Sequence, residues 1–134
     1  MEIAIIGTGV TKFGHHWDKD HDDLLVEAVN EALANANLEM KDIEAVWCGT
    51  FYPSTGISGN VFSDSLKFFG KPISRVENYC ATGMDNVRNA CFAVASGAYD
   101  SDRRWKPWLT TNRGDFQRCY ACCECSKNVC DGCE

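Results

Sequence analysis

The sequence lacks a long apolar run. No stretch of it approaches the roughly 20 apolar residues that a helix needs to span a bilayer. The N-terminus, MEIAIIGTGV, carries an acidic residue and a glycine turn where a secretory signal needs a basic segment and then a longer apolar one. We therefore expect a cytoplasmic protein with no membrane partner.

Clustered basic side chains are also missing. The chain has 13 Lys and Arg against 19 Asp and Glu, which gives a formal net charge of -6. Because binding to a nucleic-acid backbone requires grouped Lys and Arg, we expect no nucleic-acid partner. With 134 residues, 45% of them hydrophobic, the chain is long enough for one main globular domain with its own core.

The composition changes near Asp100. Residues 1–100 hold 7 basic and 14 acidic groups, whereas residues 101–134 hold 6 and 5, and six of the nine cysteines lie between Cys119 and Cys133. In a reducing cytoplasm these cysteines do not indicate a disulfide framework. Only three of the last 34 residues are Leu, Ile, Val or Phe. We expect residues 101–134 to be an irregular, disordered tail unless a ligand orders them.

The first hundred residues alternate between strand and helix patterns. Buried-strand runs cover residues 2–9, 44–50 and 73–78, and helical spacing covers 22–36, 60–70 and 81–96. This alternation predicts an α/β fold, a sheet with covering helices. The expected core positions of the three helices are Leu24, Leu25, Ala28, Val29, Ala32, Leu33 and Ala36, then Phe62, Leu66 and Phe69, then Met84, Val87, Cys91 and Val94.

Two segments near the N-terminus resemble a nucleotide-binding motif and a metal site, but neither has the spacing of one. Gly7 and Gly9 resemble the start of a dinucleotide fingerprint, but the third glycine is Gly14 and the helix pattern begins only at about Asp22. The stretch HHWDKDHDD is rich in potential metal ligands, yet no pair in it has the spacing of a known site. We interpret it as a solvated loop that caps the following helix.

Cys80 lies between an apolar strand and a helix of small residues. A thiolate is a far better nucleophile than a thiol, and the N–H groups at a helix N-terminus stabilise such an anion. The following Ala81-Thr82-Gly83 leaves room for an acyl group, and backbone N–H groups there can face an oxyanion. A nucleophilic role and a small buried core residue are the two interpretations of Cys80.

Three segments resemble the N-terminal part of the thiolase superfamily. They are IAIIGTGVTKFG, AVWCGTFYPSTGISG and VENYCATGMDNVRNACFAVASGAYD, and the likeness around them covers essentially residues 1–100 in register. The likeness is greatest to sterol-carrier-protein-type thiolases of archaea and bacteria, the acetyl-CoA acetyltransferases. The resemblance implies a thiolase-like fold over residues 1–100, as an incomplete N-terminal domain whose remaining sheet strands come later in a full chain. An unfilled sheet edge and an exposed apolar helix face would promote self-association.

The resemblance also implies an activity. Cys80 matches the family nucleophile, which takes an acyl group from acyl-CoA, the substrate, as a thioester and passes it on in Claisen condensation or thiolysis. No covalently bound cofactor is implied, and full-length members form homo-oligomers. Asn78 is interpreted as a turn residue, whereas Cys91 matches a packing position and Cys48 lies in a strand of the core.

Full-length thiolases have two similar halves, and the second supplies a His, a further Cys and most of the coenzyme A pocket. His15, His16 and His21 match no active-site motif of the family and cannot take that role. We therefore expect an inactive or partial acyl-CoA acyltransferase.

The Cys-rich tail departs from the family, which continues with a core strand and a Gly-Val-Glu motif. One hypothesis is a zinc-binding or interaction module in which Cys119, Cys122, Cys130 and Cys133 form a Cys₄ site. In that alternative the chain is not an enzyme, and residues 1–100 are a scaffold.

The other hypothesis for residues 101–134 is translation in a shifted reading frame. Trp105-Lys106-Pro107-Trp108 must be encoded by TGG-AAR-CCN-TGG. Starting one base earlier allows Val-Glu-Thr-Met, which is the motif that the family has near this place. We favour the frameshift over a purposeful tail.

Overall fold

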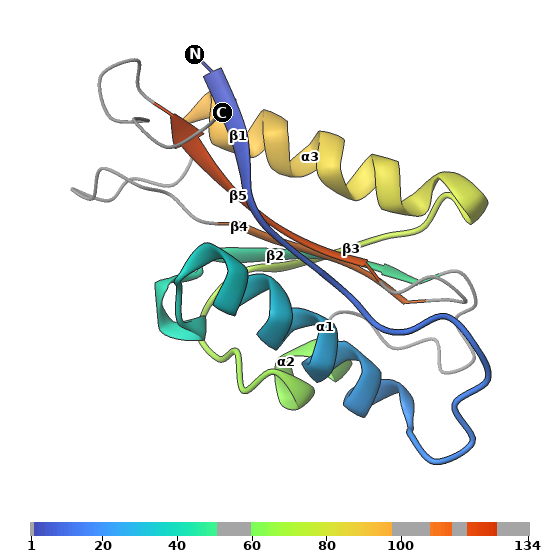
Figure 1. Cartoon of the computed structure of the whole chain (residues 1–134). Helices are drawn as coiled ribbons and strands as arrows, with labels where there is room; N and C mark the ends of the chain where they lie inside the picture. Colours follow the sequence, from blue (N-terminus) through green and yellow to red (C-terminus); the bar gives the residue numbers. More distant parts are fainter. Residues whose placement is uncertain (1, 51–59, 98–107, 114–117, 126–134) are drawn as a thin grey trace.

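A computed structural model describes residues 2–50, 60–97, 108–113 and 118–125 of the chain (Figure 1). In these ranges the structure has five strands, three α-helices and two short 3₁₀ helices. In chain order they are β1 (Glu2–Val10), α1 (His21–Ala36), η1 (Met40–Asp42), β2 (Ala45–Thr50), α2 (Asn60–Ser65), β3 (Ile73–Val76), η2 (Tyr79–Ala81), α3 (Thr82–Ser96), β4 (Trp108–Arg113) and β5 (Arg118–Cys125). Across the described ranges, no helix is both long and apolar enough to cross a membrane.

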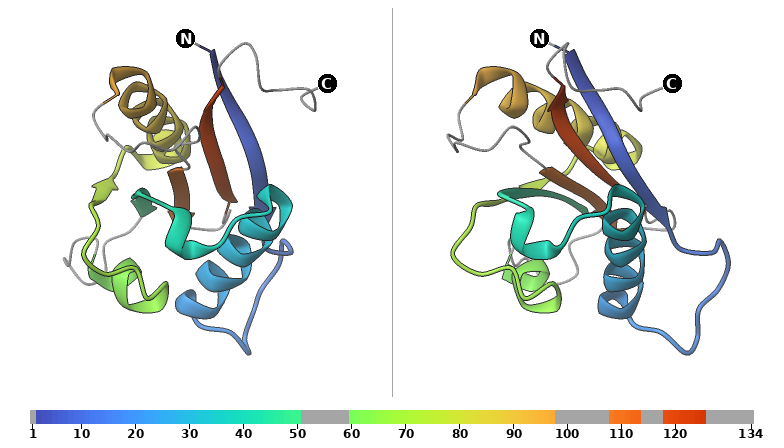
Figure 2. Two further views of the ribbon diagram at one scale, coloured as in Figure 1. Left: turned by 90° about the vertical axis from the view of Figure 1, so that its left-hand side faces the viewer. Right: turned by 60° about the vertical axis from the view of Figure 1, so that its left-hand side comes forward.

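The strands form one mixed sheet in the order β1-β5-β4-β2-β3. β2 runs parallel to β3 and to β4, whereas β5 is antiparallel to β4 and to β1. Helices α1 and α2 cover one face of the sheet and α3 covers the other (Figures 1 and 2). The α/β fold predicted from the sequence is confirmed.

The last part of the chain differs from the expectation of an irregular tail. The segments 108–113 and 118–125 form β4 and β5, which lie between β1 and β2 and fill the place where we expected the sheet to be incomplete. The expectation of an irregular tail is therefore wrong for these two segments. The physical reason is that strand pairing uses backbone hydrogen bonds, so a segment poor in aliphatic side chains can still complete a sheet. The remaining tail residues lie outside the described ranges.

α1 lies directly against β1, and two glycines allow this close approach. A Cβ atom on Gly9 would overlap the carbonyl oxygen of Ala28, and one on Gly7 would overlap the carbonyl oxygen of Ala32. The pair of glycines is therefore explained by strand–helix packing.

Side chains of α1 also bind the backbone of β1. The N–H of Thr8 donates to Oδ1 of Asn35 at 3.3 Å, and the N–H of Val10 donates to Oε2 of Glu31 at 2.8 Å. β1 is at the edge of the sheet, and the bonds to these two amides limit its pairing with another chain.

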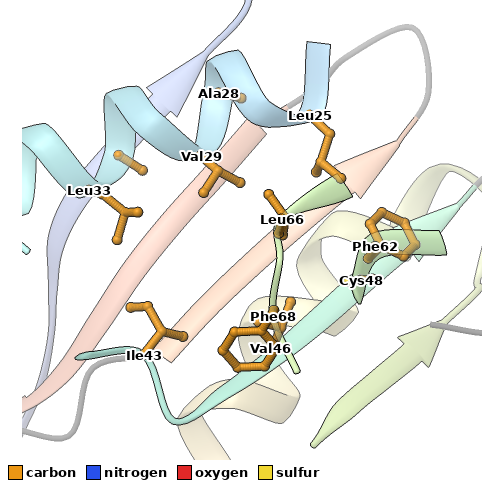
Figure 3. Packing of buried hydrophobic residues seen from close by; sticks show 11 residues of the cluster. Leu25, Ala28, Val29, Leu33, Ile43, Val46, Cys48, Phe62, Leu66 and Phe68 are labelled. Carbon is orange, nitrogen blue, oxygen red and sulfur yellow. The ribbon is translucent and has the colours of Figure 1, made fainter. Parts of the chain in front are cut away.

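The main core lies between α1, α2 and β2 (Figure 3). The predicted apolar face of α1 is confirmed, because Leu25, Ala28, Val29, Ala32 and Leu33 are all buried. Cys48 is completely buried in β2, as predicted for a core residue.

Two predicted core positions were wrong. Phe69 is 65% exposed, whereas Phe68 is buried, because α2 ends at Ser65 and Lys67 turns the chain with a left-handed φ of 52°. Met84 is 80% exposed, because the face of α3 that packs on the sheet is not the face that contains Met84. The buried residues of that face are Thr82, Asn86, Ala90 and Val94.

The loop before α1 caps the helix, as the sequence indicates. Oδ1 of Asp20 accepts the N–H groups of Asp22 and Asp23, both at 2.9 Å, and Oδ2 of Asp23 accepts the N–H of Asp20 at 3.2 Å. This is a reciprocal capping box that satisfies N–H groups of the first turn.

Replacing Gly9 with Ala should lower the free energy of unfolding by about 2 kcal/mol, because the new methyl group meets helix backbone that cannot rotate away. Urea denaturation followed by circular dichroism measures this change. Thr8→Ala is the matched control on the exposed side of the same strand and should change stability by less than about 1 kcal/mol. Equal effects of the two substitutions would contradict the close packing of α1 on β1.

Asp20→Ala should destabilise the protein by about 1 kcal/mol through loss of the helix cap. Asp20→Asn keeps an oxygen acceptor for the N–H groups of Asp22 and Asp23 and should retain most of the stability. The midpoints of thermal unfolding compare the two variants. If Asn is as destabilising as Ala, the cap does not act through this acceptor.

Candidate active site

Cys80 lies at the junction between β3 and α3 (Figure 1). The chain leaves β3 at Val76, passes through the single turn η2 and enters α3 at Thr82. This junction is at the carboxyl end of a strand in the parallel part of the sheet, where open α/β folds place their ligands. The structure therefore confirms the strand-to-helix position predicted for Cys80.

Cys80 is exposed in the structure. A small buried core residue, the alternative interpretation, is therefore wrong for this cysteine. With Cys80 just before the helix, its sulfur is accessible to a reagent or an acyl donor at the N-terminal end of a 15-residue helix.

The turn that carries Cys80 has an unusual backbone conformation. Tyr79 has a φ of 46°, in the left-handed region that residues other than glycine seldom adopt. Its N–H donates to Oε1 of Glu77 at 2.9 Å, and the N–H of Ala81 donates to the carbonyl of Asn78 at 2.9 Å. Asn78 is therefore a turn residue, as the sequence predicts.

Thr82 contributes a hydroxyl group to the same turn. Its Oγ1 donates to the carbonyl of Tyr79 at 2.7 Å and accepts the N–H of Asn78 at 2.8 Å. Our sequence reasoning treated Thr82 only as a small residue and missed this role. A threonine at the first helical position, two residues after the candidate nucleophile, was the signal that could have indicated it.

The histidines are not brought to Cys80. His21 is the first residue of α1, on the other face of the sheet from α3 (Figure 2). His15 and His16 belong to the loop between β1 and α1, where the His15 ring stacks on Trp17 with centroids 5.7 Å apart and His16 Nε2 lies 2.6 Å from the carbonyl of Lys12. Within the part of the chain that the structure describes, no group of three or more His, Cys, Asp or Glu residues is placed to hold a metal ion.

The proposed zinc ligands are divided between described and undescribed parts of the chain. Cys119 and Cys122 both lie in β5, where extended backbone places residues three positions apart about 10 Å from each other. Two sulfurs that bind one zinc ion must lie within about 5 Å of each other, so β5 would have to turn between these cysteines to form a zinc knuckle. Cys130 and Cys133 lie outside the described residues.

Comparison with known proteins establishes the family. The model of the thiolase N-terminal domain matches residues 3–101. This chain belongs to the thiolase family. The matched range runs from the second residue of β1 to beyond the end of α3, and it includes Cys80.

Curated relatives agree with this assignment. The acetyl-CoA acetyltransferases of Methanothermobacter thermautotrophicus and Methanocaldococcus jannaschii are 33% and 34% identical over 103 residues, which are 74% of this chain. Sterol carrier protein 2 of Bos taurus is 32% identical over 100 residues, 73% of this chain. The matches span 27%, 26% and 18% of these relatives, so this thiolase chain corresponds to about a quarter or less of their length.

Solved structures show the same fold over a wider range. OleA of Xanthomonas campestris, with bound lauric acid and lauroyl-CoA, has a TM-score of 0.74 at 11% identity and covers 98% of this chain and 58% of its own. The 3-oxoacyl-[acyl-carrier-protein] synthase III of Aquifex aeolicus has a TM-score of 0.73 at 15% identity and covers 95% and 55%. The likeness shows that the thiolase-like fold extends beyond residue 101 and includes β4 and β5.

Limited alkylation of the native chain should modify Cys80 before Cys91 and Cys91 before Cys48, because they are exposed, half-buried and buried, respectively. Peptide mass spectrometry after treatment with iodoacetamide gives the three rates. Under denaturing conditions the three rates should converge. Native modification of Cys48 as fast as Cys80 would contradict the placement of these residues.

Proposed function

We propose that this thiolase chain carries the nucleophilic part of an acyl-CoA acyltransferase, with Cys80 as the acyl acceptor. The observation that carries the proposal is the exposed Cys80 at the β3–α3 junction, inside the range that matches the thiolase N-terminal domain. The names of the archaeal relatives, acetyl-CoA acetyltransferases, support an acyl-CoA as the donor.

The proposed step is transfer of an acyl group between two sulfur atoms. The thiolate of Cys80 attacks the carbonyl carbon of the acyl-CoA thioester, and a new bond forms between that carbon and the Cys80 sulfur. The bond between the carbon and the coenzyme A sulfur then breaks, and coenzyme A leaves as a thiolate that takes a proton from solvent. The number of thioester bonds is unchanged, so the step needs no oxidant and no energy source.

The N-terminal end of α3 favours this chemistry. The helix dipole and the N–H groups of the first turn favour the negative charge that develops on the oxygen of the attacked carbonyl. Backbone N–H groups at the β3–α3 junction, that of Cys80 among them, are the candidate donors to this oxyanion.

We further infer that the described residues support acylation but not efficient turnover. The chain brings no histidine to Cys80, and the matched relatives extend far beyond the region that they share with it. Resolution of the acyl-enzyme, either by coenzyme A in thiolysis or by a second acyl-CoA in condensation, therefore requires groups from a longer polypeptide or from another chain.

Incubation of the purified chain with acetyl-CoA should give a single acetyl adduct on Cys80, measured by intact mass and by peptide mapping. Cys80→Ala should abolish the adduct, whereas Cys91→Ala, on the same helix, should leave it unchanged.

No adduct on the native wild-type chain, or an equal adduct on the Cys80→Ala chain, would contradict the role of Cys80. A separate assay of acetoacetyl-CoA thiolysis should show little turnover. Thiolysis at the rate of a full-length thiolase would overturn the inference that further groups are required.

A further inference from the structure

Thr82 has a buried side chain next to an exposed candidate nucleophile. It is 1% exposed, and its hydroxyl group is fully engaged, as a donor to the carbonyl of Tyr79 and as an acceptor of the N–H of Asn78. The backbone N–H of Thr82 donates to the same carbonyl of Tyr79. One residue therefore makes three hydrogen bonds to the two residues that immediately precede Cys80.

These bonds hold a conformation that the chain does not favour by itself. Tyr79 has its φ at 46°, and a residue with a Cβ atom stays in this region only when its surroundings hold it there. The Tyr79 ring is 73% exposed, so burial of the ring contributes little. Glu77 binds the N–H of Tyr79, but Glu77 is on the surface, where water competes for its carboxylate. The bonds made by the buried Thr82 are better protected.

The hydroxyl of Thr82 does not cap its own helix. A capping side chain accepts N–H groups of the first helical turn, and the N-cap of α3 is Ala81, which makes no such bond. The Thr82 hydroxyl instead binds backward, to groups that precede the helix. Its contacts therefore fix the turn around Cys80 more directly than they stabilise α3.

We propose that Thr82 is a positioning residue for Cys80. Its hydroxyl ties Asn78 and Tyr79 to the first residue of α3, and this keeps the Cys80 sulfur exposed at the N-terminal end of the helix. The relevance of this role to catalysis rests on the proposed acyl transfer to Cys80. The geometric role itself can be tested without any acyl-CoA.

Three variants of the full chain test the proposal. Thr82→Val has nearly the same shape but no hydroxyl, and Thr82→Ser restores the hydroxyl. Val29→Ala removes buried methyl groups from the core on the other face of the sheet, and it controls for a general loss of stability. Two properties are measured for each folded variant: hydrogen exchange of the Asn78 amide by NMR, and the rate of alkylation of Cys80 by iodoacetamide, with Cys91 as the internal reference.

We expect Thr82→Val to lose protection of the Asn78 amide and to slow alkylation of Cys80 by about tenfold relative to Cys91, since the turn relaxes and the sulfur leaves the helix terminus. Thr82→Ser should restore both properties, and Val29→Ala should change neither ratio. If the role of Thr82 is purely structural, Thr82→Val and Val29→Ala should both lower stability. The rate of Cys80 alkylation relative to Cys91 should then stay the same in both variants.

The proposal is overturned if Thr82→Val keeps the relative alkylation rate of the wild type, or if Ser fails to restore it. If Thr82→Val does not fold, hydrogen exchange of the Asn78 amide in the wild type is the test. An amide that exchanges as fast as in an unstructured peptide would show that it is not bonded to the Thr82 hydroxyl, and this would overturn the proposal. Failure of the wild type to accept an acetyl group would remove the proposed function, while these readouts would still test the positioning role.

Discussion

The contact between the backbones of α1 and β1 is the constraint on which the rest of the fold depends. Gly7 and Gly9 let the helix lie directly on the strand, and this sets the depth at which the apolar face of α1 meets the sheet. At that depth Val29 and Val46 of β2 belong to the same core cluster. β2 in turn pairs with β3, whose carboxyl end leads into the turn of Cys80. The position of the candidate nucleophile thus follows from packing on the opposite face of the sheet.

The buried face of α3 changes in character along its length. Far from Cys80 it is apolar, and Ala90 and Val94 pack on Trp47 of β2. Near Cys80 it is polar, because Thr82 and Asn86 are the buried residues there. Apolar contacts hold the helix on the sheet without specifying a direction for any hydrogen bond, whereas buried polar groups require partners in defined positions. Apolar contacts therefore hold α3 at its far end, whereas directed hydrogen bonds of Thr82 fix the end near Cys80.

Local patterns in the sequence predicted α1, its cap, β2, β3 and the junction at Cys80, because each depends on side-chain periodicity or on a short motif. The pairing of β4 and β5 was missed, since it joins segments far apart in the chain through backbone groups that every residue carries. The orientation of α3 was also wrong. Met84 is more apolar than Thr82, but the face that packs on the sheet is the one with the smaller side chains Thr82, Ala90 and Val94. The left-handed Tyr79 has no signal in composition or periodicity.

The candidate site is shaped by contacts between residues that are close in sequence, whereas the fold depends on contacts between distant segments. The hydrogen bonds that shape the turn join residues 77–82 to one another. A change of reading frame beyond residue 100 would alter β4 and β5, but it would leave every one of these bonds within unaltered sequence. In the proposed function, resolution of an acylated Cys80 has the opposite requirement, since it needs groups that these residues do not contain. The turn around Cys80 can therefore keep its shape within residues 77–82, while the proposed turnover would depend on residues from elsewhere.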